Sequence, residues 1–317
     1  MACCTLHASF KPFTERLGLT SKERYRPTGV IAAVVTPFRE DESLDEARLV
    51  SHLEYLIQSG VHGLMVTGGS GEYVNLTPAE RKRVVSVTMQ TVGKRLPVTV
   101  GALCPSTREA VDLGVHAAKE GAAALLLLPP YYIKPSLSGA LSHFDTVVKE
   151  TGLDIIAYNN PGRTGWTVDV EQLKQIAAIP GIVGVKECDR DVASLSLKMA
   201  AVGDKIEVLS GDDDLGFATL LSGSKGAIWA SPNLNPRLCL DLYDACMAQD
   251  VAKALPLHVR LVHLVSSWLI PNHPGPLKEA MAMAGRPVGC ARRPLAAMSA
   301  AQRAALQEAF KTYGPVE

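Results

Sequence analysis

One lysine stands directly after a short apolar run and could act as a nucleophile. Lys186 follows the run 182–185, so a strand there would place the amine at an apolar edge. Desolvation lowers the pKa of a lysine, and a free amine forms Schiff bases with ketones. On position alone, a lysine at a strand end that extends its ammonium into water is the alternative. Lys186 is the sharpest candidate for covalent chemistry in this chain.

Other residues with chemical potential also follow apolar runs. Tyr158 could act as a general acid or base, with Tyr132 as its relay partner. The turn 68–71 (GGSG) could hold a carboxylate with its N–H groups and the Ser70 hydroxyl. Arg163, in a Pro-Gly loop, could bind a carboxylate with both arms of its guanidinium. Each residue alone has an ordinary structural explanation, as a core tyrosine, a tight turn or a solvated arginine. Their combination indicates a site.

Eight short apolar runs follow Pro27 and alternate with amphipathic stretches. Each run is continuous, as expected of strands that are buried on both faces of a parallel sheet. The capping-box patterns 77–80 (TPAE) and 106–109 (STRE) predict helix starts between the runs, and 44–59 predicts another helix. The runs lie at 30–36, 63–67, 98–102, 123–128, 155–158, 182–186, 206–210 and 226–230.

Eight strand–helix units favour an α/β fold of the closed (β/α)8 TIM-barrel type. A doubly wound sheet usually has fewer strands and a GxGxxG turn after the first, whereas the first run here ends in TPF. In a barrel, the residues after the strands meet at one end. Residues 235–312 predict three further helical segments. We therefore expect an N-terminal extension at 1–27, a barrel at 28–234 and a C-terminal helical subdomain at 235–317.

Charge and hydropathy exclude several function classes. The chain has 32 Lys and Arg against 32 Asp and Glu, so it offers no long-range field for nucleic acid or an anionic membrane. No apolar run reaches the roughly 18–20 residues of a membrane-spanning helix. The eight histidines are scattered, and neither a metal-binding cluster nor a Walker-type phosphate loop occurs. We expect no metal, no nucleic-acid partner and no membrane partner.

Cysteine usage and the N-terminal residues bear on the compartment. Seven cysteines without a CxxC pair support neither a disulfide framework nor a zinc site, which favours the reducing cytoplasm. Residues 1–26 lack the apolar core of a secretory signal. Their basic and hydroxyl residues leave organellar targeting open, whereas Glu15 and Glu23 argue against a transit peptide.

The motifs at the run ends resemble those of the dihydrodipicolinate synthase/N-acetylneuraminate lyase superfamily of class I aldolases. The resemblance covers about residues 28–311, which is nearly all of the chain after the extension. The motifs that carry it are VTPF at 35–38, GGSGE at 68–72, PYY at 130–132, YNNPGRTG at 158–165, VKE at 185–187 and SGDD at 210–213.

This resemblance implies a reaction that begins with pyruvate or another 2-oxo acid. Lys186 would form an imine with the ketone, so no cofactor is needed. Tyr158 would shuttle protons, and Tyr132 would reach into the site of a neighbouring subunit of a homo-oligomer, a dimer or a tetramer. The expected holders of the pyruvyl end are Gly69, Ser70, Gly71, Gly211 and Ile228.

The resemblance leaves the second substrate open between two classes. In the dihydrodipicolinate synthases, an arginine at the position of Arg163 binds the carboxylate of aspartate semialdehyde. The presence of Arg163 therefore favours a synthase of lysine biosynthesis. Those synthases read GTTGE where this chain has GGSGE, and Gly69 has no hydroxyl to link the two tyrosines. Such loops are more similar to those of 2-keto-3-deoxy-sugar-acid aldolases and dehydratases, a catabolic alternative. A third and remote possibility is a barrel that binds a ligand without converting it. The presence of both Lys186 and Tyr158 argues against that possibility.

Regulation is a further expectation from the resemblance. Many synthases of this superfamily are inhibited by lysine, which binds at a dimer interface. Of the matching positions, only Glu109 and Tyr131 keep the usual residue type, and Pro105 replaces a hydrogen-bonding asparagine. The sequence therefore predicts weak binding of lysine. The matching residues are Tyr73, Val74, Pro78, Arg81, Pro105, Glu109 and Tyr131.

Overall fold

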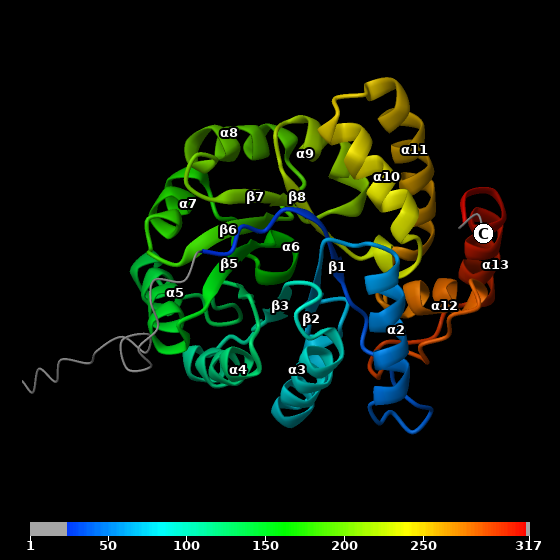
Figure 1. Ribbon diagram of the computed structural model, residues 1–317, viewed down its shortest axis with the longest axis horizontal. Coiled ribbons are helices and arrows are strands. Elements are labelled where there is room, and N and C mark those ends of the chain that lie inside the picture. Colours follow the sequence, from blue (N-terminus) through cyan, green and yellow to red (C-terminus); the bar gives the residue numbers. More distant parts are fainter. Residues whose placement is uncertain (1–23, 315–317) are drawn as a thin grey trace, which may run out of the picture.

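A closed barrel of eight parallel strands forms the centre of the computed structural model, which describes residues 24–314 (Figure 1). Neighbouring strands pair in sequence order, and β1 also pairs with β8, so the sheet has no open edge. This closure confirms the (β/α)8 barrel and excludes the doubly wound sheet. The strands are β1 (Gly29–Ala33), β2 (Gly63–Val66), β3 (Val98–Gly101), β4 (Ala124–Leu127), β5 (Asp154–Asn159), β6 (Ile182–Glu187), β7 (Glu207–Ser210) and β8 (Gly226–Trp229).

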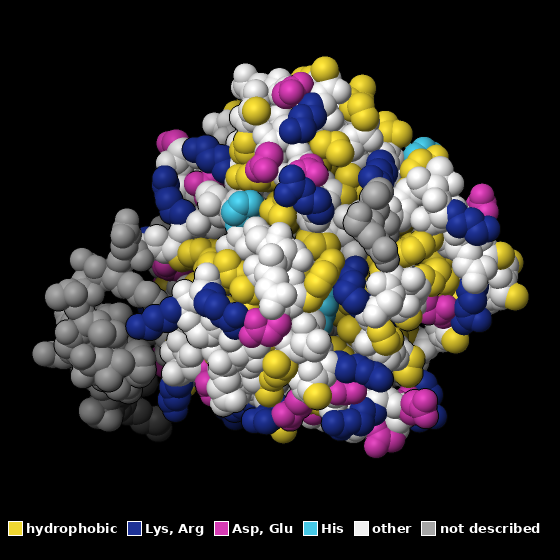
Figure 2. Space-filling view, turned by 45° about the vertical axis from the view of Figure 1, so that its right-hand side comes forward, with side chains coloured by type: hydrophobic (Ala, Val, Ile, Leu, Met, Phe, Trp, Pro, Cys, Tyr) yellow, Lys and Arg dark blue, Asp and Glu magenta, His cyan; other side chains and the backbone are white. Residues whose placement is uncertain are grey.

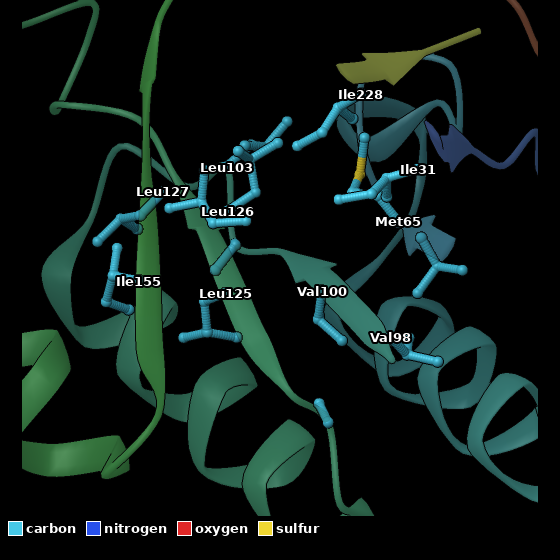
Figure 3. Close-up of a cluster of buried hydrophobic side chains, with 14 of the residues drawn as sticks. Ile31, Met65, Val98, Val100, Leu103, Leu125, Leu126, Leu127, Ile155 and Ile228 are labelled. Carbon is cyan, nitrogen blue, oxygen red and sulfur yellow. The ribbon is translucent and has the colours of Figure 1, made fainter. Parts of the chain in front are cut away.

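The strands read as continuous apolar runs because both of their faces are covered. Every residue of β1, β2, β3, β4, β6 and β8 is buried. Figure 3 shows buried side chains from several of these strands gathered in one cluster, among them Met65, Val100, Leu125 and Ile228. Helices cover the other face, as the interior layers of a barrel require.

Helices ring the barrel between successive strands (Figure 1). The predicted capping box at Thr77 is confirmed, because its side chain and that of Glu80 bond each other's backbone N–H. The box predicted at Ser106 is wrong: this side chain makes no cap bond, and Glu109 instead pairs with Arg81 at 2.9 Å. The helices are α2 (Glu46–Gln58), α3 (Pro78–Val92), α4 (Thr107–Glu120), α5 (Leu137–Thr151), α6 (Pro161–Thr164), α7 (Val170–Ala177), α8 (Val192–Val202) and α9 (Gly216–Leu221).

Four helices follow β8 where the sequence predicted three. They are α10 (Pro236–Met247), α11 (Val251–Trp268), α12 (Gly275–Met283) and α13 (Ala300–Tyr313). Pro271 and Pro274 lie between α11 and α12, and Pro276 stands in the first turn of α12, where the missing N–H of proline costs no helix hydrogen bond. These helices share a second core with Val30 and Trp229 of the barrel wall. The division of the chain at 27/28 and 234/235 stays a prediction, and residues 1–23 lie outside the described part.

A buried ion pair fastens the C-terminal helices to the barrel. The Nζ atom of Lys278 on α12 lies 2.5 Å from Oε1 of Glu72, and both side chains are enclosed. The same ammonium donates to the carbonyl of Thr36 at 2.7 Å. Removing one partner of such a pair leaves an uncompensated buried charge, so the pair holds α12 against the turn after β2. No helix in residues 24–314 is long and apolar enough to cross a membrane.

Candidate active site

A cavity of about 670 Å³ opens at the carboxyl end of the barrel strands. Its size falls within the range of small-molecule sites. Apolar side chains form part of its wall, and these include Met65 and Ile228. Of the sequence-predicted residues, the cavity brings together Gly69, Ser70, Tyr158, Arg163, Lys186, Gly211 and Ile228.

Lys186 differs from the other buried lysines in its partners. Lys198 lies within 2.9 Å of Glu187 and 2.5 Å of Asp189, and Lys278 pairs with Glu72. Lys186 is only 6% exposed, yet no carboxylate of residues 24–314 lies within ion-pair distance of it. It lines the cavity instead. A buried amine without a carboxylate partner is available to a ligand, whereas the two paired lysines are structural.

The backbone after β7 makes room for Lys186. A Cβ atom on Gly211 would lie 3.0 Å from the Cε atom of Lys186 and 2.3 Å from the Sγ atom of Cys188. Such contacts cannot be tolerated without movement, so glycine is required here. The lysine then extends over the Tyr158 ring, with Nζ 4.8 Å from the ring centroid.

The Tyr158 hydroxyl is held as a proton donor. It accepts a hydrogen bond from the Asn160 side chain at 2.8 Å and a long one from the Cys188 thiol at 3.9 Å. A phenol oxygen has two acceptor positions and one proton, so the proton stays free for the cavity. Burial raises the pKa of Tyr158 well above its usual value, which keeps the phenol protonated.

The turn after β2 presents a small polar surface to the cavity. Among the described residues, the N–H groups of Ser70 and Gly71 have no protein acceptor, as a carboxylate-binding turn requires. Gly69 lines the cavity, and a Cβ atom there would meet nothing within 4 Å. Gly71 is not in the cavity wall; its carbonyl accepts from the Thr36 hydroxyl at 2.7 Å.

Arg163 lies on the short helix α6 at the cavity mouth. Its side chain makes no ion pair among residues 24–314, and the residue is exposed. The loop around it is braced, because Lys134 donates to the Gly165 carbonyl at 2.5 Å and Thr164 donates to the Asn160 carbonyl at 3.0 Å. The loop that carries Arg163 is therefore fixed, and the guanidinium, which has no ion-pair partner among the described residues, can bind an anion.

Tyr132 does not join the cavity of its own chain. It is 93% exposed, and the adjacent Tyr131 lines the cavity in its place and donates to the Leu103 carbonyl at 3.1 Å. The relay between Tyr158 and Tyr132 is therefore not formed within one described chain.

Sequence reasoning assigned no role to several polar residues of the cavity wall, among them Asp212, Cys188 and His273. Asp212 belongs to the motif at 210–213 but had no assigned role; it lines the cavity, and burial raises its pKa to about 6 against the opposing effect of Arg190. Cys188 and His273 also line the cavity. The position of Cys188 two residues after Lys186 could have indicated it. His273 lies in the α11–α12 connection, far from any strand end, and carried no signal.

Charges of both signs are interspersed on the face of the molecule shown in Figure 2, as the net charge of zero suggests.

Within the described part of the chain, no group of three His, Cys, Asp or Glu side chains is placed to hold a metal ion.

Comparisons of the sequence and of the structure with known proteins point to the same family. Residues 26–313 match the model of the dihydrodipicolinate synthetase family. The 4-hydroxy-tetrahydrodipicolinate synthase of Thermodesulfovibrio yellowstonii is 36% identical, over 91% of this chain and 99% of its own length. The crystal structure of dihydrodipicolinate synthase from Aquifex aeolicus is 33% identical with a TM-score of 0.87, and the match covers 90% of this chain and 98% of that one.

A second similar structure contains a ligand. The chloride-inhibited dihydrodipicolinate synthase of Acinetobacter baumannii, complexed with pyruvate, is 31% identical with a TM-score of 0.88. That match covers 91% of this chain and 99% of the other. The barrel, its cavity and these matches define a class I lyase, an enzyme that works through a lysine Schiff base. The chain belongs to the dihydrodipicolinate synthetase family.

Proposed function

We propose that this enzyme is a 4-hydroxy-tetrahydrodipicolinate synthase, which condenses pyruvate with aspartate semialdehyde in lysine biosynthesis in the cytoplasm. The observation that carries the proposal is that Lys186 and Arg163, neither of which has a carboxylate partner among residues 24–314, share one cavity. This condensation needs a nucleophile for the 2-oxo acid and a guanidinium that can bind a second carboxylate with two hydrogen bonds. The names of the relatives support the same choice.

The first half of the reaction takes place on Lys186. Its amine attacks C2 of pyruvate, and the former carbonyl oxygen leaves as water to give an iminium. The iminium withdraws electrons, so a proton leaves C3 and an enamine forms. Tyr158 is protonated and its proton is unengaged, so it donates to the departing oxygen. Ser70, Gly71 and Gly69 hold the pyruvate carboxylate with N–H groups and a hydroxyl, beside Gly211 and Ile228.

The second half joins the two substrates. The enamine carbon attacks the aldehyde carbon of the semialdehyde, and the aldehyde oxygen takes up a proton to become a hydroxyl. The α-amine of the semialdehyde then adds to C2 and expels the Lys186 amine, which closes a six-membered ring. One water is lost overall, at imine formation. Arg163 holds the semialdehyde carboxylate at the cavity mouth during both steps.

A direct assay tests the proposal against its alternative. The enzyme is incubated with pyruvate and aspartate semialdehyde, and in parallel with 2-keto-3-deoxygluconate, and products are identified by mass spectrometry. We expect a cyclic condensation product from the first pair and no pyruvate release from the sugar acid. Cleavage or dehydration of the sugar acid without condensation would contradict the synthase.

The Gly69 position favours a second candidate, a 2-keto-3-deoxy-sugar-acid aldolase or dehydratase. A Cβ atom on Gly69 would meet nothing within 4 Å, so the turn leaves open space at the cavity. That space could hold the hydroxylated chain of a sugar acid, and the missing hydroxyl removes a relay partner of Tyr158. The assay above decides between the two candidates.

The role of Arg163 predicts a selective change in substrate requirement. Arg163→Ala should raise the KM for aspartate semialdehyde by roughly 10- to 100-fold, the effect of losing charged hydrogen bonds, and leave the KM for pyruvate nearly unchanged. Arg163→Lys keeps the charge but loses the two-pronged hydrogen bonding of the guanidinium. Its KM for aspartate semialdehyde should therefore lie between those of the unaltered enzyme and Arg163→Ala. Steady-state kinetics with each substrate varied in turn measures this. Equal effects on both substrates would mean that Arg163 only supports the loop.

We infer that the enzyme works as a homo-oligomer, a dimer or a tetramer, in which Tyr132 of one subunit reaches the site of the other. Tyr132 and Ile133 are 93% and 80% exposed, and Val74 beside the cavity is 74% exposed. Large apolar and aromatic side chains that are this exposed are typical of a surface that a partner covers.

Feedback inhibition by lysine is not expected, because a cation already occupies the matching region. The Arg81 guanidinium lies 3.8 Å from the centroid of the Tyr73 ring and 2.9 Å from the Glu109 carboxylate. Tyr73 in turn donates to the Cys104 thiol at 2.6 Å. Glu109 is therefore neutralised, and Pro105 has no N–H to offer. An incoming ammonium would meet a like charge.

We predict that millimolar lysine leaves the rate of condensation unchanged. A buried ammonium or carboxylate without a partner costs several kcal/mol, so the amino acid cannot satisfy all its charges there. Initial rates over a lysine titration measure the effect. Inhibition below millimolar concentration would refute this prediction, and it would add support for the biosynthetic function.

A further inference from the structure

His273 connects the C-terminal helices to the cavity of the barrel. It lies between α11 and α12, and its Nε2 atom is 3.2 Å from the Oγ atom of Ser70. Its ring packs beside Trp268, with the two ring centroids 5.6 Å apart. The Nδ1 atom is enclosed and has no hydrogen-bond partner among the described residues. Ser70 is therefore the one hydrogen-bond partner of this side chain within residues 24–314.

The protonation state of His273 limits what this contact can be. Burial lowers the pKa of His273 to about 4, and the Arg163 and Lys186 cations add to this effect. The ring is therefore neutral near neutral pH, with one N–H and one bare nitrogen. When Nε2 carries the hydrogen, it donates to Ser70. When Nδ1 carries it, the Ser70 hydroxyl must donate to Nε2.

Only one of these arrangements allows the Ser70 hydroxyl to donate to a carboxylate. An ionised carboxylate accepts hydrogen bonds and cannot donate them. The Ser70 proton must therefore point to the ligand, and its oxygen must accept from Nε2–H. Because the adjacent Gly69 has no side chain, Ser70 supplies the one hydroxyl of the 68–71 turn.

We propose that His273 is a positioning residue, which donates its Nε2–H to Ser70 and so turns the Ser70 hydroxyl toward the carboxylate of the 2-oxo acid. The inference rests on the proposed function only for its first half, the binding of pyruvate at Lys186. It assigns to the C-terminal helices a direct part in recognising the substrate, in addition to packing against the barrel.

A matched pair of variants separates the hydrogen bond from the volume of the side chain. His273→Gln and His273→Met have similar length, but only glutamine keeps an N–H donor that can reach Ser70. Half-saturation by pyruvate is measured from the extent of borohydride trapping on Lys186. We expect a rise of about 5- to 10-fold for His273→Met, the effect of one hydrogen bond, and at most about 2-fold for His273→Gln. Trapping at saturating pyruvate should stay complete in both.

The double variant tests whether His273 acts through Ser70. Ser70→Ala alone should weaken pyruvate binding, and adding His273→Met should weaken it no further, because the oriented hydroxyl is already gone. Multiplied effects, equal affinities of the glutamine and methionine variants, or reduced trapping at saturation would overturn the inference. Aspartate semialdehyde is absent from this experiment. The result therefore does not depend on the condensation assay, which tests the synthase proposal independently.

Discussion

The Lys186→Ala protein is expected to fold normally and to lose turnover by at least roughly 10⁴-fold. Covalent catalysis has no substitute when its nucleophile is removed. The fold survives because Lys186 lacks a carboxylate partner in the described chain and faces the cavity, so its removal leaves no buried charge unpaired. Turnover is measured by the condensation assay, and stability by thermal unfolding, where we expect a change within about 1 kcal/mol.

A surface lysine provides the matched control for this prediction. Lys174 pairs with Glu171 on the exposed side of α7, away from the cavity, so Lys174→Ala should keep both turnover and stability. Measurable turnover in Lys186→Ala above the level without enzyme would show that another group carries the reaction.

Tyr158→Phe is expected to slow turnover by about 10²- to 10⁴-fold, the usual effect of removing a positioned acid or base. The phenol is the group beside Lys186 whose proton is left free by its own hydrogen bonds. The variant should fold, because the ring is kept, but Asn160 and Cys188 lose an acceptor. Single-turnover kinetics should place the loss at imine formation from pyruvate.

Tyr243→Phe serves as the control for the loss of a phenol. The Tyr243 hydroxyl donates to the Lys225 carbonyl at 3.0 Å and does not line the cavity, so this variant should turn over normally. A rate for Tyr158→Phe close to that of the unaltered enzyme would mean that another group moves the proton.

The barrel could be predicted from the sequence because the pattern of an apolar strand followed by an amphipathic helix repeats along the chain. Six of the eight strands are buried at every residue and read as apolar runs, and capping residues such as Thr77 and Asp169 mark helix starts directly. The C-terminal helices were counted as three rather than four. Their apolar pattern continues from α11 toward α12, and only the prolines of the connection reveal the break.

The site was predictable as far as strand ends define it. Lys186 and Tyr158 are the last residues but one of β6 and β5, and Ser70 lies in the turn after β2, so the barrel brings them together. His273 could not be found in this way, because it reaches Ser70 from 203 positions away through the packing of α11 and α12. Tyr132 follows a strand but is exposed, and a single chain does not decide what it contacts. Asp212 also follows a strand and belongs to the motif at 210–213, but its residue type alone did not assign it a role in the cavity.

Borohydride trapping with pyruvate, followed by peptide mass spectrometry, tests the central claim most directly. The account predicts one reduced pyruvyl group per chain, located on Lys186, and none on Lys198 or Lys278, whose ammonium groups are held by carboxylates. Samples without pyruvate, and the Lys186→Ala protein, should carry no adduct. An adduct located on another residue, or none at all with the unaltered enzyme, would contradict a Schiff-base mechanism on Lys186.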